Sequence, residues 1–219
     1  MSIKEQYSVQ SIKPSETYDW LLNKHYANRI PSISYAFGLF EDKILFKNKE
    51  LLGICTFGSP ASNSLCIGVC GINYKSQIIE LNRLCVNDHN TKNLTSYFLG
   101  NCLKMLPAPK IVVSYSDTQQ NHNGYIYQAT NWIYTGATKE RTDIGFEDNK
   151  HSRHYNKNID YTQNRKFRSS KHRYIMFLGN KTQKKNMLKN LKYNIEPYPK
   201  GQNKRYDASY QPQVQLNLL

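Results

Sequence analysis

The sequence predicts a mixed α/β fold with a basic C-terminal extension, and three observations support this prediction. The 219 residues are enough for one domain of about 150 residues and an elaboration. Strand-like segments come first and then alternate with helix-like segments, as in mixed sheets. The charge is unevenly divided, because residues 1–149 hold 14 Lys and Arg against 13 Asp and Glu, whereas residues 150–219 hold 16 against 3. We therefore expect a nearly neutral core of residues 1–149 and a basic extension of residues 150–219.

The N-terminal half predicts a short helix and an antiparallel meander. Ser15 is a candidate N-cap for a helix from Glu16 to about His25, and Pro31 ends this unit. Four strands are expected to follow, with tight polar turns between the first three: Tyr35–Phe40, Lys43–Lys47, Leu51–Phe57 and Gln77–Val86. Alternation in the fourth strand places Glu80 and Arg83 on opposite faces, so one of these charges points into the interior and needs a partner.

The rest of the chain predicts alternating helices and strands. Asn93–Leu106 has apolar residues at helical spacing, and Pro107-Ala108-Pro109 stops it. Lys110–Tyr115 is a mostly apolar strand, which is typical of the centre of a sheet. The remaining elements are a helix from Gly124 to about Asn131, strands Ile133–Thr138 and Ile175–Leu178, and a basic helix Asn180–Leu191. Roughly the last ten residues are expected to be poorly ordered.

Composition argues against membrane proteins and disulfide-stabilised secreted proteins. No apolar run reaches the roughly 18 residues that a spanning helix needs, and the N-terminus lacks a hydrophobic secretion signal. The five cysteines are an odd number and lie in apolar segments, which indicates buried thiols in a reducing compartment. We therefore expect a soluble, cytoplasmic protein without a membrane partner. The oligomeric state stays open, because no amphipathic dimer seam is visible.

The segment that ends at Asp117 is the strongest candidate for chemistry. A buried strand that ends in Ser114, Ser116 and Asp117 brings hydroxyls and a carboxylate to the sheet edge where ligands of open α/β folds bind. Tyr127 lies among aromatic and amide residues, a composition that suits a flat, hydrogen-bonding ring such as a flipped base. A structural interpretation stays open, in which Asp117 caps the next helix and Tyr127 is a core aromatic.

Several long blocks stand out between about Tyr18 and Lys200. They are His25-Tyr-Ala-Asn-Arg-Ile-Pro31 with Phe37-Gly-Leu-Phe, Thr56-Phe-Gly-Ser-Pro-Ala-Ser62, Glu80-Leu-Asn-Arg-Leu84, Val113-Ser-Tyr-Ser-Asp117, Gly124-Tyr-Ile-Tyr-Gln-Ala-Thr-Asn131 and Tyr134-Thr-Gly136. These blocks resemble the bacteriophage Mom family of DNA modification proteins. The resemblance implies a GNAT-like acyltransferase fold. It also implies an activity that adds a carbamoylmethyl (acetamido) group to the exocyclic amine of adenine in double-stranded DNA, which protects phage DNA from restriction in the host cytoplasm.

The resemblance also implies which residues are functional. They are His25, Tyr26, Arg83, Asp117 and Tyr127, with Ser114 and Ser116 as additions. Because the amine of adenine is a poor nucleophile, we expect Asp117 to act as a base or acceptor and Tyr127 as a proton relay or stacking partner. Arg83 is expected to anchor a carboxylate or phosphate of the donor. His25 is a candidate base or, with Asp117, a ligand of a divalent metal, although no ligand spacing demands a metal.

One turn departs from the pattern of GNAT enzymes. Where those enzymes bind the pyrophosphate of coenzyme A at a glycine-rich turn, this chain has Asn87-Asp-His-Asn-Thr-Lys92, which contains no glycine and includes an Asp that repels phosphate. Acyl-CoA is therefore disfavoured as the donor. The identity of the donor stays open, with an aminoacyl group or another activated group as the alternative.

The basic extension interleaves cations with aromatic residues, which favours binding to nucleic acid. Six of its cations are predicted to contact the DNA backbone: Arg153, Arg165, Lys166, Arg168, Lys171 and Arg173. A solvated charged face is the structural alternative. Three functions therefore compete, namely a DNA adenine modification enzyme, a noncatalytic DNA-binding regulator, and a GNAT-like acetyltransferase that acts on amines of protein or RNA.

Overall fold

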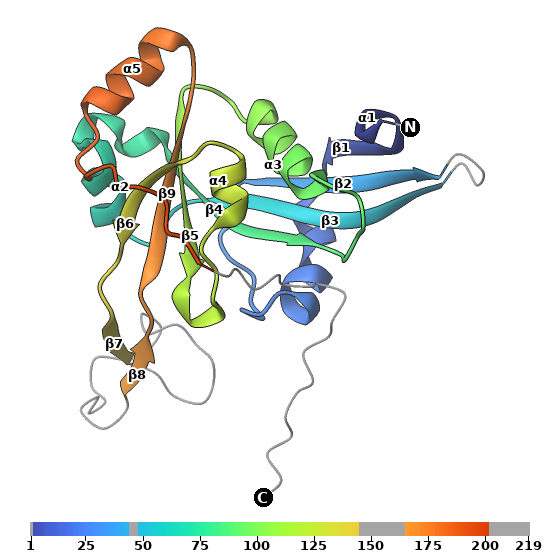
Figure 1. The fold of residues 1–219 in the computed structure, drawn as a ribbon, viewed down its shortest axis with the longest axis horizontal. Helices are drawn as coiled ribbons and strands as arrows, with labels where there is room; N and C mark the ends of the chain where they lie inside the picture. Colours follow the sequence, from blue (N-terminus) through green and yellow to red (C-terminus); the bar gives the residue numbers. More distant parts are fainter. Residues whose placement is uncertain (1, 44–47, 145–164, 202–219) are drawn as a thin grey trace, which may run out of the picture.

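A computed structural model describes residues 2–43, 48–144 and 165–201 of the chain. Its main feature is a seven-stranded sheet in the order β1-β2-β3-β4-β5-β9-β6 (Figure 1). The strands are β1 (Tyr7–Ser11), β2 (Tyr35–Lys43), β3 (Asn48–Gly58), β4 (Ile78–Val86), β5 (Lys110–Asp117), β6 (Ile133–Ala137) and β9 (Lys171–Leu178). Neighbouring strands are antiparallel except β4 and β5, which are parallel. The predicted mixed α/β fold is confirmed.

Helices cover both faces of this sheet (Figure 1). The largest apolar cluster contains residues of α3 (Leu94–Met105) and α4 (Tyr125–Ala129), and a second cluster contains residues of α2 (Asn63–Cys70) and α5 (Lys181–Lys189). In β5, Val112 belongs to the first cluster, whereas Ile111 and Val113 belong to the second. Successive side chains of a strand point to opposite faces, so β5 is buried on both sides, as its apolar sequence predicts.

The helical segments before β2 and the thiols complete the core. A short helix α1 (Ile3–Gln6) precedes β1, and the predicted helix after it is a 3₁₀ turn (Pro14–Thr17) followed by a π-helical turn (Trp20–Lys24). All five cysteines are buried and free, which confirms their interpretation as packed thiols.

None of the helices in the described part of the chain combines the length and apolar character needed to cross a membrane.

β4 and β5 are paired only along their first residues. The ladder joins residues 78–80 of β4 to residues 111–113 of β5, and beyond it the two strands diverge (Figure 1). At this point Ser114 Oγ donates to the Leu81 carbonyl at 2.9 Å, so a side chain bonds the carbonyl where the backbone ladder has ended. The C-terminal halves of two adjacent parallel strands are thereby separated, and the candidate site lies between them.

A bulge in β4 changes the direction of its side chains. The register of β4 against β3 shifts at Asn82. Leu81 packs in the largest apolar cluster, whereas Cys85, which strict alternation places on the same face, packs in a separate cluster. Because a bulge adds one residue to the strand, Arg83 lies on the face of Glu80. The predicted placement of these two charges on opposite faces is therefore wrong.

β2 and β3 are longer than the first and third strands of the predicted meander, and most of the predicted second strand, Lys43–Lys47, lies outside the described residues. Glu41 and Asp42, which were expected in a turn, continue β2 and pair with residues 50 and 49 of β3. Lys49 and Asp42 form an ion pair of 3.2 Å across the two strands, so complementary charge offsets the low strand propensity of these residues. Residues 44–47 lie outside the described part of the chain.

The basic C-terminal part contributes directly to the main sheet. β9 follows the predicted boundary at Lys150, yet it pairs with β5 on one side and β6 on the other. Met187 of α5 is buried in the second apolar cluster. A two-stranded ribbon of β7 (Arg141–Ile144) and β8 (Arg165–Arg168) projects from one end of the sheet (Figure 1). The predicted division after Asn149 therefore does not separate a core from an extension.

Candidate active site

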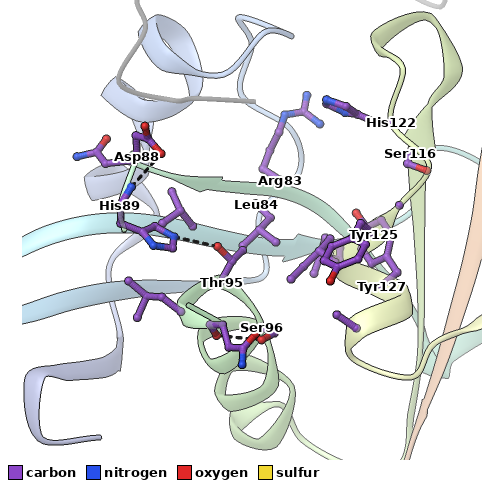
Figure 2. A pocket seen from close by; sticks show the side chains of 18 of the residues that line it. Arg83, Leu84, Asp88, His89, Thr95, Ser96, Ser116, His122, Tyr125 and Tyr127 are labelled. Atoms are coloured by element: carbon purple, nitrogen blue, oxygen red, sulfur yellow. Dashed lines mark hydrogen bonds between the residues drawn. The ribbon is translucent and has the colours of Figure 1, made fainter. Parts of the chain in front are cut away.

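A cavity of about 630 Å³ lies where β4 and β5 diverge (Figure 2). This volume is in the range of sites for small ligands. Its walls come from β4, the loop between β4 and α3, the first turn of α3, the end of β5 and α4. Five of the seven predicted catalytic residues line it: His25, Tyr26, Arg83, Ser116 and Tyr127. Separate segments of sequence thus converge on one chamber.

Tyr127, which lines the cavity, forms a buried hydroxyl pair with Ser114 of β5. The ring of Tyr127 packs against Trp132 and Tyr174, with centroids 5.1 and 4.9 Å away. Ser114 Oγ lies 2.7 Å from the Tyr127 hydroxyl and 2.9 Å from the Leu81 carbonyl. A serine hydroxyl has one proton, so both bonds form together when Ser114 donates to the carbonyl and Tyr127 donates to Ser114. Burial raises the pKa of Tyr127 well above its usual value, so the phenol stays protonated.

His25 is buried and held in its neutral form. Burial, together with the neighbouring charges of Arg83 and His122, lowers its pKa to about 3. The backbone N–H of Ala27 donates to Nδ1 at 3.1 Å, which assigns the proton to Nε2. Tyr26 stacks on this ring with centroids 4.4 Å apart. His25 therefore offers the cavity an N–H donor and an aromatic face rather than a basic nitrogen.

Arg83 and Ser116 bring polar groups to the opening between the two strands. The terminal nitrogen NH1 of Arg83 donates to the Asn82 carbonyl at 2.5 Å. Arg83 Nε is buried and has no hydrogen-bond partner among the described residues, and the same is true of Ser116 Oγ on β5. Buried polar atoms normally have hydrogen-bond partners. Two such atoms without partners in one cavity therefore indicate a place where a ligand provides the missing hydrogen bonds.

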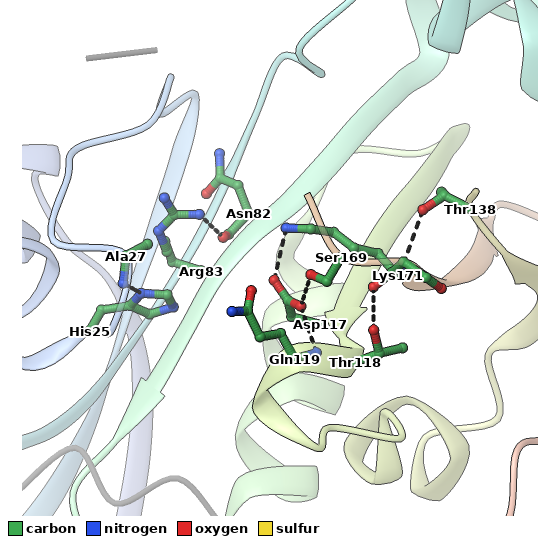
Figure 3. Close-up of polar contacts among 11 residues, drawn as sticks. His25, Ala27, Asn82, Arg83, Asp117, Thr118, Gln119, Thr138, Ser169 and Lys171 are labelled. Carbon is green, nitrogen blue, oxygen red and sulfur yellow. Dashed lines mark hydrogen bonds and ion pairs between the residues drawn. The ribbon is translucent and has the colours of Figure 1, made fainter. Parts of the chain in front are cut away.

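Asp117 ends β5, but within the described structure it is not one of the residues that line the cavity. Its carboxylate accepts from Ser169 Oγ at 2.5 Å and from the Gln119 N–H at 3.0 Å, and it pairs with Lys171 at 3.2 Å (Figure 3). Burial raises the pKa of Asp117, but the Ser169 hydrogen bond and the Lys171 charge outweigh burial and leave the pKa below its usual value. This geometry fits the capping role that the sequence left open better than the role of a base.

The loop from Asn87 to Asn93 occupies the position of the expected cofactor turn. His89 Nε2 lies 3.2 Å from Thr95 Oγ1, and Thr91 Oγ1 lies 2.9 Å from the Tyr7 hydroxyl of β1. The side chains of His89 and Thr91 thus fix the loop to α3 and to the edge of the sheet. Asp88 belongs to this loop and lines the cavity.

One cavity residue, His122, and one residue outside the cavity lining, Glu80, had not been assigned a role from the sequence. His122 lines the cavity, and its ring lies edge-on to Tyr26 with centroids 6.3 Å apart. Glu80 lies beside the cavity on the face of Arg83; burial raises its pKa, and the charge of Arg83 opposes that effect. The sequence feature that could have identified His122 as a site residue is its position near the end of the polar loop that follows β5, shortly before Gly124. No three His, Cys, Asp or Glu side chains of the described residues gather as metal ligands.

The predicted DNA-contacting cations on β8 belong to the projecting ribbon. Arg165 is exposed, and its Nε donates to Thr142 Oγ1 at 2.9 Å. Arg168 is half-buried. Arg153 and the side chain of Lys166 lie outside the described residues.

The cations on β9 already have partners within the protein. Arg173 donates from Nε and NH2 to the side chain and carbonyl of Thr135, at 2.9 and 2.8 Å. Its guanidinium also lies 3.4 Å above the ring of Tyr193. Lys171 pairs with Asp117. Both residues therefore stabilise the fold, and a backbone phosphate would compete with these contacts.

A mixed sheet whose adjacent parallel strands part over a cavity belongs to the GNAT class of acetyltransferase folds. The structure is similar to that of Arabidopsis thaliana NAA60 in complex with a bisubstrate analogue, with a TM-score of 0.50 and 9% sequence identity over 78% of this chain and 97% of that chain. The predicted GNAT-like fold is confirmed.

The sequence identifies the family within this class. Residues 6–200 match the Mom protein family, and the chain belongs to it. One relative is the methylcarbamoylase mom of Escherichia phage Mu, which is 24% identical over 193 residues that cover 81% of this chain and 77% of the relative.

Proposed function

We propose that this protein is a transferase that adds a carbamoylmethyl group to the exocyclic amine of adenine in double-stranded DNA. On this proposal it protects phage DNA from restriction enzymes in the host cytoplasm. The observation that supports it most strongly is membership of the Mom family together with a cavity that gathers five of the residues expected from that family.

Adenine must leave the base stack to enter such a cavity, because a duplex hides its amine. The stacked rings of His25 and Tyr26 offer an aromatic surface for the base. The neutral imidazole of His25 can donate a hydrogen bond from Nε2 to a purine ring nitrogen. These side chains therefore have the chemistry to bind a flat ring that presents acceptors along its edge.

Tyr127 has the chemistry to orient the amine. When its own proton is directed at Ser114, the phenol oxygen accepts a hydrogen bond from the adenine N–H and holds the nitrogen lone pair toward the donor. We propose that Asp117 acts indirectly, since its carboxylate joins the end of β5 to Ser169 and Lys171. It is thus a positioning residue between the cavity and the ribbon.

The ribbon is the best candidate for contact with the DNA backbone. Arg165 and Lys166 lie on β8, and Arg165 is exposed. We propose that these two residues, with Arg153 and Arg168, bind phosphates. The cations on β9 contribute less, because their protein contacts must first be given up.

Mass spectrometry of nucleosides from plasmid DNA tests the proposed activity. Bacteria that express the protein should contain a new deoxyadenosine species carrying a carbamoylmethyl group, and cells that express Tyr127→Phe should contain much less. Unmodified deoxyadenosine, with the protein soluble and bound to DNA, would indicate a noncatalytic regulator instead. Acetylated protein or RNA amines would indicate the third function.

A further inference from the structure

The two sides of the cavity differ in charge (Figure 2). Asp88 lies on the side formed by the loop before α3, and Arg83 lies on the side formed by the β4 bulge. On the loop side of the cavity, the Asp88 carboxylate would repel a phosphate. Lys92, which belongs to the same loop as Asp88, is exposed. The partly buried cation of the cavity is thus at the strand opening, away from the helix N-terminus.

Arg83 forms no ion pair within the described part of the chain, although the charge of Glu80 acts on it. Its one hydrogen bond goes to the backbone carbonyl of Asn82, and its Nε is buried without a partner. Glu80 lies on the same face, but the Ala61 backbone N–H bonds its carboxylate and no ion pair joins it to Arg83. A partly buried guanidinium that forms no ion pair is costly, so an anionic ligand would stabilise this arrangement.

The opposite side of the opening supplies a second donor. Ser116 on β5 is only 6% exposed, and its hydroxyl has no partner among the described residues. In Figure 2 the side chains of Arg83 and His122 point toward each other, Ser116 lies apart from them on β5, and all three line the cavity. A guanidinium and a hydroxyl are the donors that proteins use for carboxylate and phosphate oxygens.

We propose that Arg83 and Ser116 form an oxyanion-binding subsite at the opening between β4 and β5. It binds a carboxylate or phosphate group and replaces a phosphate site at the α3 N-terminus. The group comes either from the donor or from the phosphodiester of the flipped nucleotide. The subsite rests on the geometry alone, and only this choice of source rests on the proposed function.

The subsite can be tested without catalysis by NMR of the full-length protein with labelled histidines. Inorganic phosphate and acetate are titrated at fixed pH and ionic strength, with chloride as the control anion. We expect saturable shifts of the His25 and His122 resonances with phosphate or acetate and none with chloride. Arg83→Gln should weaken the binding by at least about tenfold, and Ser116→Ala by about two- to tenfold.

Lys92→Gln is the matched control, because it removes a cation from the other side of the same cavity. It should leave the affinity within about twofold of wild type. The proposal is overturned if Lys92→Gln abolishes binding while Arg83→Gln does not, or if neither anion shifts the two histidines. Ser116→Ala removes only a hydroxyl, so it remains informative if Arg83→Gln fails to fold.

A second titration in the presence of a saturating DNA duplex separates the two sources. If the duplex displaces phosphate, the subsite holds the phosphodiester of the target nucleotide. If phosphate binds equally well with the duplex in place, the subsite holds the acidic group of the donor. Either result supports the subsite, and neither requires that deoxyadenosine be modified.

Discussion

At the scale of single residues, hydrogen bonds decide which predicted groups can do chemistry. For both Asp117 and Tyr127, the sequence left a functional and a structural interpretation open. The structure separates them: Asp117 is bound by Ser169 and Lys171, whereas Tyr127 lines the cavity. Contacts between residues about fifty positions apart make this difference, and no local pattern contains them.

Removal of the Tyr127 hydroxyl should reduce activity far more than stability. Tyr127→Phe keeps the ring among its aromatic neighbours and loses one hydrogen bond, which costs about 1 kcal/mol of unfolding free energy. We expect DNA modification to fall by on the order of 10²-fold or more, because the amine is no longer oriented. Nucleoside mass spectrometry and chemical denaturation measure the two effects.

Tyr97→Phe is the matched control for this variant. It removes a comparable hydrogen bond, from the Tyr97 hydroxyl to the Tyr7 carbonyl at 3.2 Å, outside the cavity lining. Modification at the wild-type level is expected. Equal losses of activity in the two variants would mean that Tyr127 acts only through the fold.

Asp117 should make stability depend on acid pH. Its pKa is lower in the folded state than the ordinary value of about 3.9, so the ionised carboxylate stabilises the fold. That contribution is complete above the ordinary pKa and is lost as pH falls through the folded-state pKa. The stability difference between wild type and Asp117→Asn should therefore shrink as pH drops from about 5 to about 2.

Urea denaturation at several pH values measures this difference. Asp19→Asn, at an exposed carboxylate bonded only to Asn23 in the described residues, is the control and should keep the wild-type profile. A difference in unfolding free energy between wild type and Asp117→Asn that stayed constant across the acid range would contradict the stabilising role of the ionised carboxylate.

At the scale of elements, the sequence predicts helices and strands where one periodicity continues. α3 and β5 were predicted closely, because an apolar stripe or run covers their whole length. The face predicted for Arg83 was wrong. The bulge at Asn82 is fixed by the register with β3, and no pattern in the β4 sequence indicates it. β1 was missed because its five residues contain one fully buried side chain, Tyr7.

Gly124 should be required for the placement of α4. Its φ of +68° is in the left-handed region, and a Cβ there would lie 2.4 Å from the ring of Tyr174. Gly124→Ala should destabilise the protein by about 1–3 kcal/mol through both backbone strain and this clash. The change is measured by chemical denaturation.

Gly100 provides the opposite case within α3. A Cβ added there meets nothing within 4 Å, so Gly100→Ala should stabilise by about 0.5–1 kcal/mol through helix propensity. If Gly100→Ala also destabilised the protein, the loss of stability in Gly124→Ala could not be assigned to the contact with Tyr174.

At the scale of the whole molecule, net charge predicted a polyanion-binding function but not its boundaries. The basic segment was expected to be an addition to a finished core. Instead β9 lies in the main sheet, and two of its cations are used for internal contacts. A count of charges cannot distinguish a cation that faces solvent from one that pairs with Asp117 or stacks on Tyr193.

The ribbon should account for part of the salt dependence of DNA binding. Arg165→Gln should weaken binding to duplexes of different sequence about equally, and should reduce the slope of log affinity against log salt by about 1. Fluorescence anisotropy with two unrelated duplexes measures both effects. Lys181→Gln, at an exposed position on α5 at the other end of the sheet (Figure 1), should leave the slope unchanged.

The position of β9 in the sheet also determines when the protein can become active during synthesis. β5 lies beside the cavity, and one of its edges stays uncovered until a strand made more than fifty residues later pairs with it. Until then the nascent chain exposes the backbone groups of a central, apolar strand, which is a template for wrong pairing. Folding of the cavity is therefore a late, long-range event. A ribosome-bound chain that ends before β9 carries the cavity residues without the sheet that positions them.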